Sequence, residues 1–135
     1  PGYSGGVRVG RGDVTGDGVD DLVTGTAAGA PPHVKVFEGA TGGLVRSFFA
    51  FDPGFLGGLS VAAADVTGDG AADLIVGGDH RRGVGGVRVA GSGARLVAGA
   101  GTGAGPHVKV FDPAGAEVLS FLAFDPTGTG GVFVG

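Results

Sequence analysis

Cysteine, methionine and tryptophan are absent from this sequence, and tyrosine occurs once. Without cysteine no disulfide can form, but this leaves the compartment open because metal ions can stabilise an extracellular fold instead. No signal peptide or membrane-spanning run is visible, and we expect no membrane insertion. The nine lysine and arginine residues are scattered along the chain. They supply no basic face, so nucleic acid is not an expected partner.

Glycine is the residue in excess, at 33 of 135 positions. Each glycine inside a helix costs about 1 kcal/mol relative to alanine, so a chain with this much glycine disfavours helices. Hydrophobic residues nevertheless make up 42% of the chain, which is more than a disordered glycine-rich linker contains. The composition therefore predicts an all-β protein with a packed core.

Three landmarks recur along the chain in the same order. They are DVTGDGVDDLV at 13–23 and DVTGDGAADLI at 65–75, GAPPHVKVFE at 29–38 and GAGPHVKVFD at 103–112, and SFFAFDPGFLGG at 47–58 and SFLAFDPTGTGG at 120–131. The first pair is separated by 52 residues. A period of this size indicates structural repeats, each too small to bury its own faces.

The repeats divide the chain into units. We expect a first blade at 5–58, a second acidic loop with its strands at 59–84, a degenerate copy without a loop at 85–131, and the start of another unit at 132–135. The alternative is an insertion of roughly 20 residues in the second unit, with a hairpin from Val87 to Val97. The sequence leaves both open. The segment PGYSGG at 1–6 resembles the end of another unit, so we expect neighbouring repeats of the same or another chain.

Four apolar runs of strand length occur within one unit, at 7–14, 21–26, 33–39 and 44–52. Leu74, Ile75 and Val76 place apolar groups on both faces of a strand, which indicates a sheet covered on both sides. Sheets of four antiparallel strands packed around an axis meet this requirement. We therefore predict β-propeller blades, two or three of a longer ring, with a sandwich or solenoid as the alternative.

The two acidic motifs have the spacing of a calcium loop. Oxygen-bearing side chains stand at loop positions one, three, five and nine, and glycine stands at position six, where a tight turn needs it. Position seven contributes its backbone carbonyl, so its side chain is free to vary between Val19 and Ala71. Asp20 stands at position eight, where the other motif has Ala72, so we interpret Asp20 as a residue that does not bind the metal. Oxygen donors without histidine or cysteine favour Ca²⁺ over zinc, and magnesium requires no such cage.

Other calcium loops are disfavoured. An EF-hand or dockerin loop needs a carboxylate at position twelve, where this chain has Thr24 and Val76. The glycine-rich β-roll repeats its motif after nine residues, whereas this motif returns after 52.

The motif DVTGDGxxDL, together with GxxPHVKVF and FFAFDPGFxGG, resembles the FG-GAP repeat and the related VCBS-type repeat. Those repeats occur in integrin α-subunit propellers and in bacterial surface proteins. The resemblance implies two Ca²⁺ sites. Their ligands would be Asp13, Thr15, Asp17, Val19 and Asp21 in one loop, and Asp65, Thr67, Asp69, Ala71 and Asp73 in the other. Threonine at position three departs from the commoner asparagine or aspartate, so a water could intervene there.

The function expected from this resemblance is non-catalytic. We expect a calcium-stabilised segment of an extracellular or cell-surface protein that binds a protein or glycan ligand, for adhesion or ligand capture. The alternative is an accessory propeller of a secreted hydrolase or lyase whose catalytic domain lies elsewhere.

Few residues suggest catalysis. His33 and His107 occupy equivalent positions before a strand, and a repeated histidine indicates a structural role. His80 lies in a polar loop, where it could contact a ligand. The phenylalanines are interpreted as core between blades rather than as a sugar-stacking platform; they are Phe49, Phe51, Phe121 and Phe124.

Overall fold

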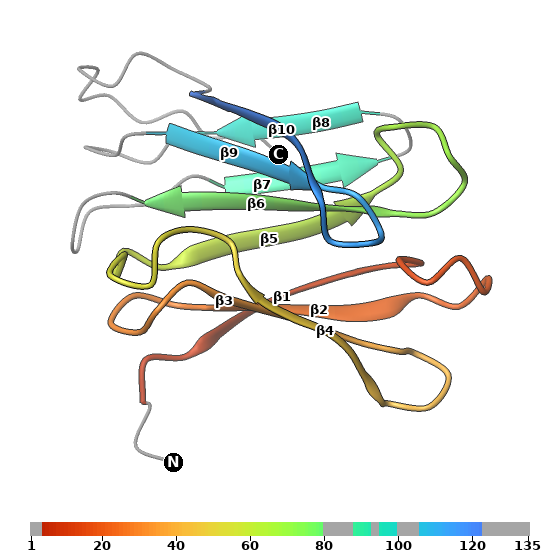
Figure 1. Ribbon diagram of the computed structural model, residues 1–135, viewed down its shortest axis with the longest axis horizontal. Coiled ribbons are helices and arrows are strands. Elements are labelled where there is room, and N and C mark those ends of the chain that lie inside the picture. The colour runs from red at the N-terminus through yellow and green to blue at the C-terminus, as the bar shows by residue number, and fades with distance from the viewer. Residues whose placement is uncertain (1–3, 80–87, 93–94, 100–105, 123–135) are drawn as a thin grey trace.

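The computed structural model describes residues 4–79, 88–92, 95–99 and 106–122, which contain strands and turns (Figure 1). Eight of the strands form two four-stranded antiparallel sheets. The predicted all-β class with propeller-like blades is confirmed. None of the described residues forms a helix long and apolar enough to cross a membrane.

The first sheet is a simple meander in which each strand pairs with the next. It contains β1 (Val7–Gly12), β2 (Asp21–Thr26), β3 (His33–Phe37) and β4 (Leu44–Phe49), in the order β1-β2-β3-β4. These strands fall within the four apolar runs of the sequence. The local hydrophobic pattern therefore predicted this sheet strand by strand.

The second sheet uses strands that are not consecutive in the chain. It contains β5 (Leu59–Ala64), β6 (Asp73–Asp79), β9 (Pro106–Phe111) and β10 (Glu117–Leu122), in the order β10-β9-β6-β5. Between β6 and β9 the chain forms a separate two-stranded hairpin, β7 (Arg88–Ser92) and β8 (Arg95–Gly99). β9 and β10 thus occupy the same places in the second sheet as β3 and β4 occupy in the first sheet.

This pairing bears on the two unit divisions that the sequence left open. β6 pairs directly with β9, from Leu74 opposite Phe111 to Asp79 opposite Pro106. Strands from 59–84 and from 85–131 therefore share one sheet. In the hairpin, Arg88 pairs with Gly99 and Ser92 pairs with Arg95.

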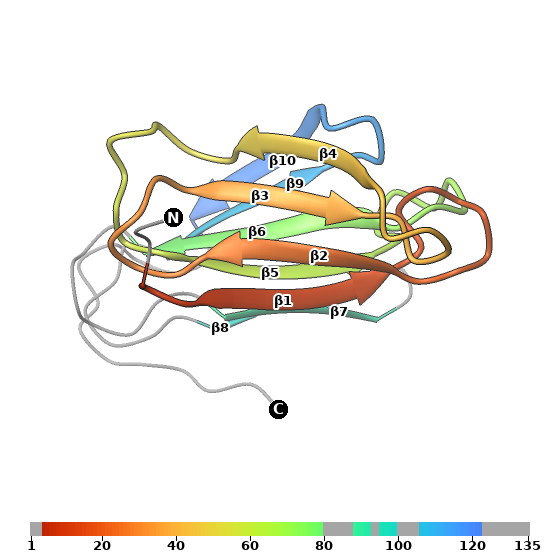
Figure 2. The same cartoon turned by 90° about the horizontal axis from the view of Figure 1, so that it is seen from below.

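The two sheets pack face to face, so that the first sheet lies in front of the second in Figure 2. One large apolar cluster fills the space between them. Val23, Val34 and Val36 of the first sheet meet Leu74 and Val76 of the second, and all five are fully buried. A smaller cluster on the far side of the second sheet contains Ala64, Ile75, Val108 and Val110, with Val89 of β7 packed against it. Leu74, Ile75 and Val76 are thus covered on both faces, as their sequence predicted.

The predicted role of the phenylalanines is confirmed only in part. Phe51 packs against the main core, and Phe121 packs against the second cluster. The prediction is wrong for Phe49, whose side chain is 49% exposed. Side chains alternate along β4, so Phe48 points inward to the Phe111 ring, while Phe49 points outward and lies over the His33 ring. Phe124 lies outside the described residues.

Candidate metal-binding loops

The two acidic motifs form equivalent turns at the same end of the two sheets. The first acidic loop (residues 13–21) joins β1 to β2, and the second acidic loop (residues 65–73) joins β5 to β6. Gly16 and Gly18 have φ values of +76° and +89°, and Gly68 and Gly70 have values of +80° and +93°. Only glycine adopts such angles readily, which explains why both motifs read T-G-D-G.

The aspartate at position one organises the turn. Asp13 Oδ1 accepts hydrogen bonds from the backbone N–H groups of Gly16 and Asp17, at 2.7 and 3.0 Å, and Oδ2 accepts one from Gly18 at 2.8 Å. Asp65 does the same in the second loop, with bonds of 2.6 and 3.1 Å to Oδ1 and 2.9 Å to Oδ2. One carboxylate therefore satisfies three amides that the turn leaves without backbone partners.

The aspartate at position nine is buried and holds the start of the loop. Asp21 is 1% exposed, and its Oδ2 accepts bonds from the N–H groups of Val14 and Thr15 at 2.9 and 2.8 Å. Its Oδ1 accepts a bond from Gly39 N at 2.9 Å, which ties the loop to the end of β3. Asp73 is 0% exposed and repeats the first two bonds, at 2.8 and 2.9 Å, while its Oδ1 accepts the Thr67 hydroxyl at 3.3 Å.

The aspartate at position five is the most open of the three. Asp17 Oδ1 accepts a bond from Val19 N at 2.8 Å, and Asp69 Oδ1 accepts one from Ala71 N at 3.0 Å. Both residues are exposed. Within the described part of the chain, the Oδ2 atom of each has no protein donor. These two oxygens are available to an external ligand.

The predicted metal ligands therefore lie in the two acidic loops, but their side chains do not form a preorganised coordination site. Among the described residues, no three Asp, Glu, His or Cys side chains lie close enough together to hold a metal ion. Most of the carboxylate oxygens instead accept backbone N–H groups. The donor chemistry, made only of oxygens, suits a hard cation such as Ca²⁺. The geometry does not show convergence of the three carboxylates, so the metal sites stay a prediction.

Charge in the loops is poorly compensated. The first acidic loop carries four aspartates, and its one ion pair among the described residues joins Arg11 Nη1 to Asp20 Oδ2 at 3.6 Å, with both side chains largely exposed. The second acidic loop carries three aspartates and has no ion pair with a described cationic side chain. Asp20, interpreted from sequence as a bystander, thus has a partner of its own.

The two loops also contact each other. Asp13 O accepts a hydrogen bond from Ala72 N at 2.7 Å, and the space beside Gly16 is bounded by the Ala71 Cβ. The alanines at positions seven and eight of the second loop are small because the first loop packs on them. The two motifs differ in sequence at positions seven and eight, but the sequence does not show that contact with the neighbouring loop is the cause. The sequence also does not indicate that the Gly39 amide donates to Asp21.

His33 takes part in a small polar cluster on the first sheet. Its Nε2 lies 2.7 Å from the Ser47 hydroxyl, and its ring centroid lies 5.0 Å from that of Phe49. Burial, and then the charge of nearby Lys35, lower the pKa of His33 from its ordinary value of 6.5. The imidazole of His33 thus has a side-chain hydrogen-bond partner, the Ser47 hydroxyl. The side chains of His80 and His107 lie outside the described residues.

Comparison with known proteins agrees with this geometry. No solved structure matched the chain. Residues 13–76 match the model of a family described as the FG-GAP-like repeat. The matched segment starts at the first aspartate of the first acidic loop and runs through the second acidic loop into β6. Over this segment, which holds both acidic loops, the chain matches the FG-GAP-like repeat.

Proposed function

We propose that this chain is a non-catalytic, propeller-type repeat module of an extracellular adhesion or ligand-binding protein, and that its acidic loops bind Ca²⁺ as a structural ion. The observation that carries the proposal is the repetition of one oxygen-rich loop with the same backbone hydrogen bonds on equivalent strands. Three like charges in a short turn repel one another, and the second loop has no ion pair with any described cation to offset them. A bound divalent cation would offset this repulsion.

The residues that would hold the ion are those named from the sequence. In the first loop they are the side chains of Asp13, Thr15, Asp17 and Asp21 with the carbonyl of Val19, and in the second those of Asp65, Thr67, Asp69 and Asp73 with the carbonyl of Ala71. Asp17 and Asp69 are the best placed, because each keeps one exposed carboxylate oxygen without a described protein donor. The other carboxylates accept N–H bonds, but a carboxylate has about four acceptor positions, so such bonds do not exhaust it.

Calcium binding would stabilise the fold, and it would do so only where the concentration of free calcium is high enough to fill the sites. With free calcium at about 100 times the dissociation constant, each site adds roughly 2.7 kcal/mol to the free energy of unfolding. Extracellular calcium, at about millimolar concentration, fills sites of about 10 μM affinity that cytosol leaves empty. We therefore propose an extracellular or cell-surface location, with a protein or glycan as the ligand and neighbouring repeats as structural partners.

A hydrolytic role for the His33–Ser47 pair is disfavoured by its surroundings. A catalytic histidine that activates serine is oriented by a carboxylate, which stabilises the imidazolium form. Here the neighbours of the imidazole are the Lys35 ammonium and the Phe49 ring, and the pKa of His33 is lowered. This environment opposes the charge that general-base catalysis would create.

Calcium titration tests the metal proposal on the intact protein. We expect isothermal titration to show Ca²⁺ uptake, and a melting temperature roughly 5–10 °C higher per filled site than in chelator. The double variant Asp17→Asn and Asp69→Asn should lose both effects. Asp20→Asn is the matched control, since it removes the same charge from an exposed position of the same loop and should retain them.

Two results would contradict the proposal: no heat of calcium binding, or a chelator-insensitive melting temperature in the unaltered protein. The ligand-binding part is tested separately, by applying the intact protein to glycan and extracellular-protein arrays with calcium and with chelator. A module that binds nothing in either condition is a spacer rather than an adhesion domain.

A further inference from the structure

The two acidic loops are joined through a peptide group. The N–H of Ala72, a residue that is 8% exposed, donates to the backbone carbonyl of Asp13 at 2.7 Å. A Cβ atom on Gly12 would lie 3.3 Å from the Ala72 Cβ. A Cβ atom on Gly16 would lie 3.7 Å from the Ala71 Cβ. Figures 1 and 2 both show the two loops at the same end of the molecule. The loops are therefore in close contact, with a hydrogen bond between their backbones.

This peptide group takes part in both proposed metal sites. Its carbonyl oxygen belongs to Ala71, the predicted donor at position seven of the second loop, and its N–H belongs to Ala72. The acceptor of that N–H is Asp13, the predicted ligand at position one of the first loop, whose carboxylate organises its own turn. Because a peptide group is planar, its carbonyl and its N–H cannot be oriented independently. A change in how the second loop holds the Ala71 carbonyl therefore reaches Asp13.

We propose that the two acidic loops are one coupled unit, in which Ca²⁺ binding at either loop raises the affinity of the other through the Ala71–Ala72 peptide group. This inference rests on the proposed function, and it adds how the two sites regulate each other. Coupling between binding sites is reciprocal, so both sites should gain affinity by the same factor. Such factors are typically about 5 to 150. We expect a value near the lower limit, because a neutral hydrogen bond is a modest interaction.

Two effects of opposite sign act between the loops. Two bound divalent cations repel each other, but Asp17 and Asp69 are exposed, so water and salt screen this repulsion. The favourable effect is conformational: a loop that its neighbour already holds loses less backbone entropy when it takes up an ion. We expect the conformational effect to be the larger one. The coupling should then increase with ionic strength, because salt weakens only the repulsion.

The second loop has fewer other supports than the first. In the first loop, Gly39 N donates to Asp21 Oδ1 at 2.9 Å. The repeated HVKVF landmark places Pro113 at the equivalent position, and proline has no N–H to donate. Asp73 Oδ1 instead accepts the hydroxyl of Thr67, at 3.3 Å. The contact with the first loop is therefore a larger share of what orders the second loop.

A site-resolved calcium titration of the full chain tests the coupling. In NMR spectra, the glycine amides of each loop report the filling of its own site. Asp69→Asn weakens the second site but keeps an acceptor for the Ala71 amide, and it should lower the affinity of the first site at least about 5-fold. Asp17→Asn should lower the affinity of the second site by the same factor. Asp20→Asn is the matched control and should change the second site less than about 2-fold.

An ester in place of the peptide bond between Ala71 and Ala72 removes the shared N–H and keeps the Ala71 carbonyl. In this protein, which carries the α-hydroxy analogue of alanine at position 72, the coupling should disappear. Asp69→Asn should then change the affinity of the first site less than about 2-fold. The glycine amides of the second loop check that its site still fills in the ester protein.

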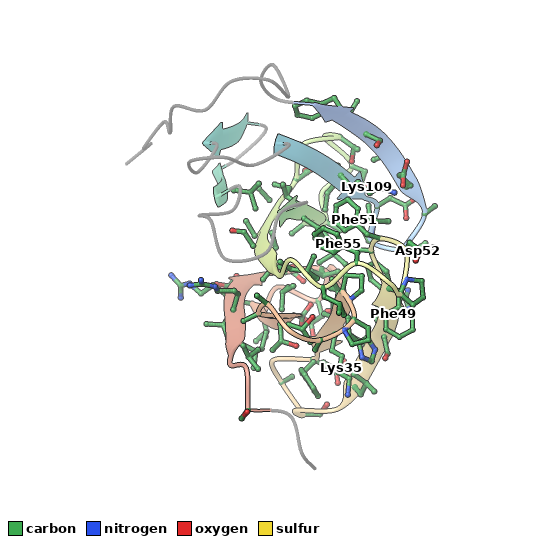
Figure 3. All side chains as sticks on the ribbon, turned by 90° about the vertical axis from the view of Figure 1, so that its left-hand side faces the viewer. Lys35, Phe49, Phe51, Asp52, Phe55 and Lys109 are labelled. Carbon is green, nitrogen blue, oxygen red and sulfur yellow. The ribbon has the colours of Figure 1, made fainter. Side chains whose placement is uncertain are left out.

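A calcium-free measurement tests the contact by itself. In chelator, Asp13→Ala removes the carboxylate that organises the first turn. Hydrogen exchange at the Ala72 amide should then become at least about 5-fold faster relative to Val110 in the core of β9. Asp52→Ala is the matched control, because the Asp52 carboxylate accepts Gly54 N at 2.8 Å in the link between the two sheets (Figure 3). This variant should leave exchange at Ala72 unchanged.

The possible results separate the coupling from the proposed function. Calcium uptake at both loops with independent affinities, together with unchanged exchange at Ala72 in Asp13→Ala, overturns the coupling and leaves the proposed function standing. A filled site that weakens the other site also overturns the coupling. No calcium uptake by the unaltered protein overturns the proposed function and the calcium part of the coupling. The exchange measurement then decides whether the two loops are coupled without metal.

Discussion

The two sheets have the same acidic loop, the same arrangement of four strands and related sequences. They differ in how far equivalent residues are buried. Val9 is 66% exposed and Val61 is 7% exposed, although both are valines at the same repeat position. The difference arises from the neighbour, because the first sheet covers the second and no described residue covers the first in the same way. In a repeat protein, burial at a given position is therefore a property of the stack rather than of the single repeat.

The largest expected contrast is between two leucines. Leu74→Ala should lower the free energy of unfolding by about 4 kcal/mol, because it leaves a cavity between the sheets. Leu22→Ala removes the same atoms at the equivalent but exposed position, and should cost about 1 kcal/mol or less. Urea denaturation of both variants measures the difference. Equal costs would show that the first sheet is as well covered as the second, and would remove the comparison.

Much of this arrangement could be predicted from sequence because it is local. Alternating apolar residues gave the strands of the first sheet, and the T-G-D-G pattern gave the turns in which glycine adopts positive φ. The pairing of β6 with β9 could not be settled, because a hairpin interrupts the repeat and strand partners are chosen over a long separation. The outward position of Phe49 was missed for a related reason, since apolar character alone does not say which face has a neighbour.

The acidic loops show the same limit. The spacing of the motif predicted which side chains share a loop. It did not predict that Asp13 and Asp21 would accept hydrogen bonds from backbone amides at most of their acceptor positions. A carboxylate that organises a turn and one that binds a cation require the same residue at the same place. The sequence pattern therefore does not separate the two roles, and an experiment without metal is needed.

A medium effect is expected when the buried loop aspartates are removed in the presence of chelator. Asp21→Ala should cost about 3 kcal/mol, because it leaves three backbone N–H groups without their acceptor. Asp73→Ala should cost somewhat less, since it strands two amides and the weaker bond from the Thr67 hydroxyl. Asp20→Ala, in the exposed pair with Arg11, should change stability by less than about 0.5 kcal/mol. If all three variants unfold like the unaltered protein in chelator, the carboxylates matter only as metal ligands.

The smallest expected effect concerns the pH response of His33 on the first sheet. The pKa of His33 is lowered from 6.5, first by burial and second by the Lys35 ammonium. The folded state then binds fewer protons than the unfolded state just below pH 6.5, so stability should fall as the pH drops through this region towards the folded-state pKa. Titration of the His33 ring followed by NMR should give a midpoint below 6.5. Lys35→Gln should raise that midpoint only part of the way, because burial remains, and Ser47→Ala tests whether the hydroxyl contributes. A midpoint at or above 6.5 in the unaltered protein would mean that water solvates the ring fully.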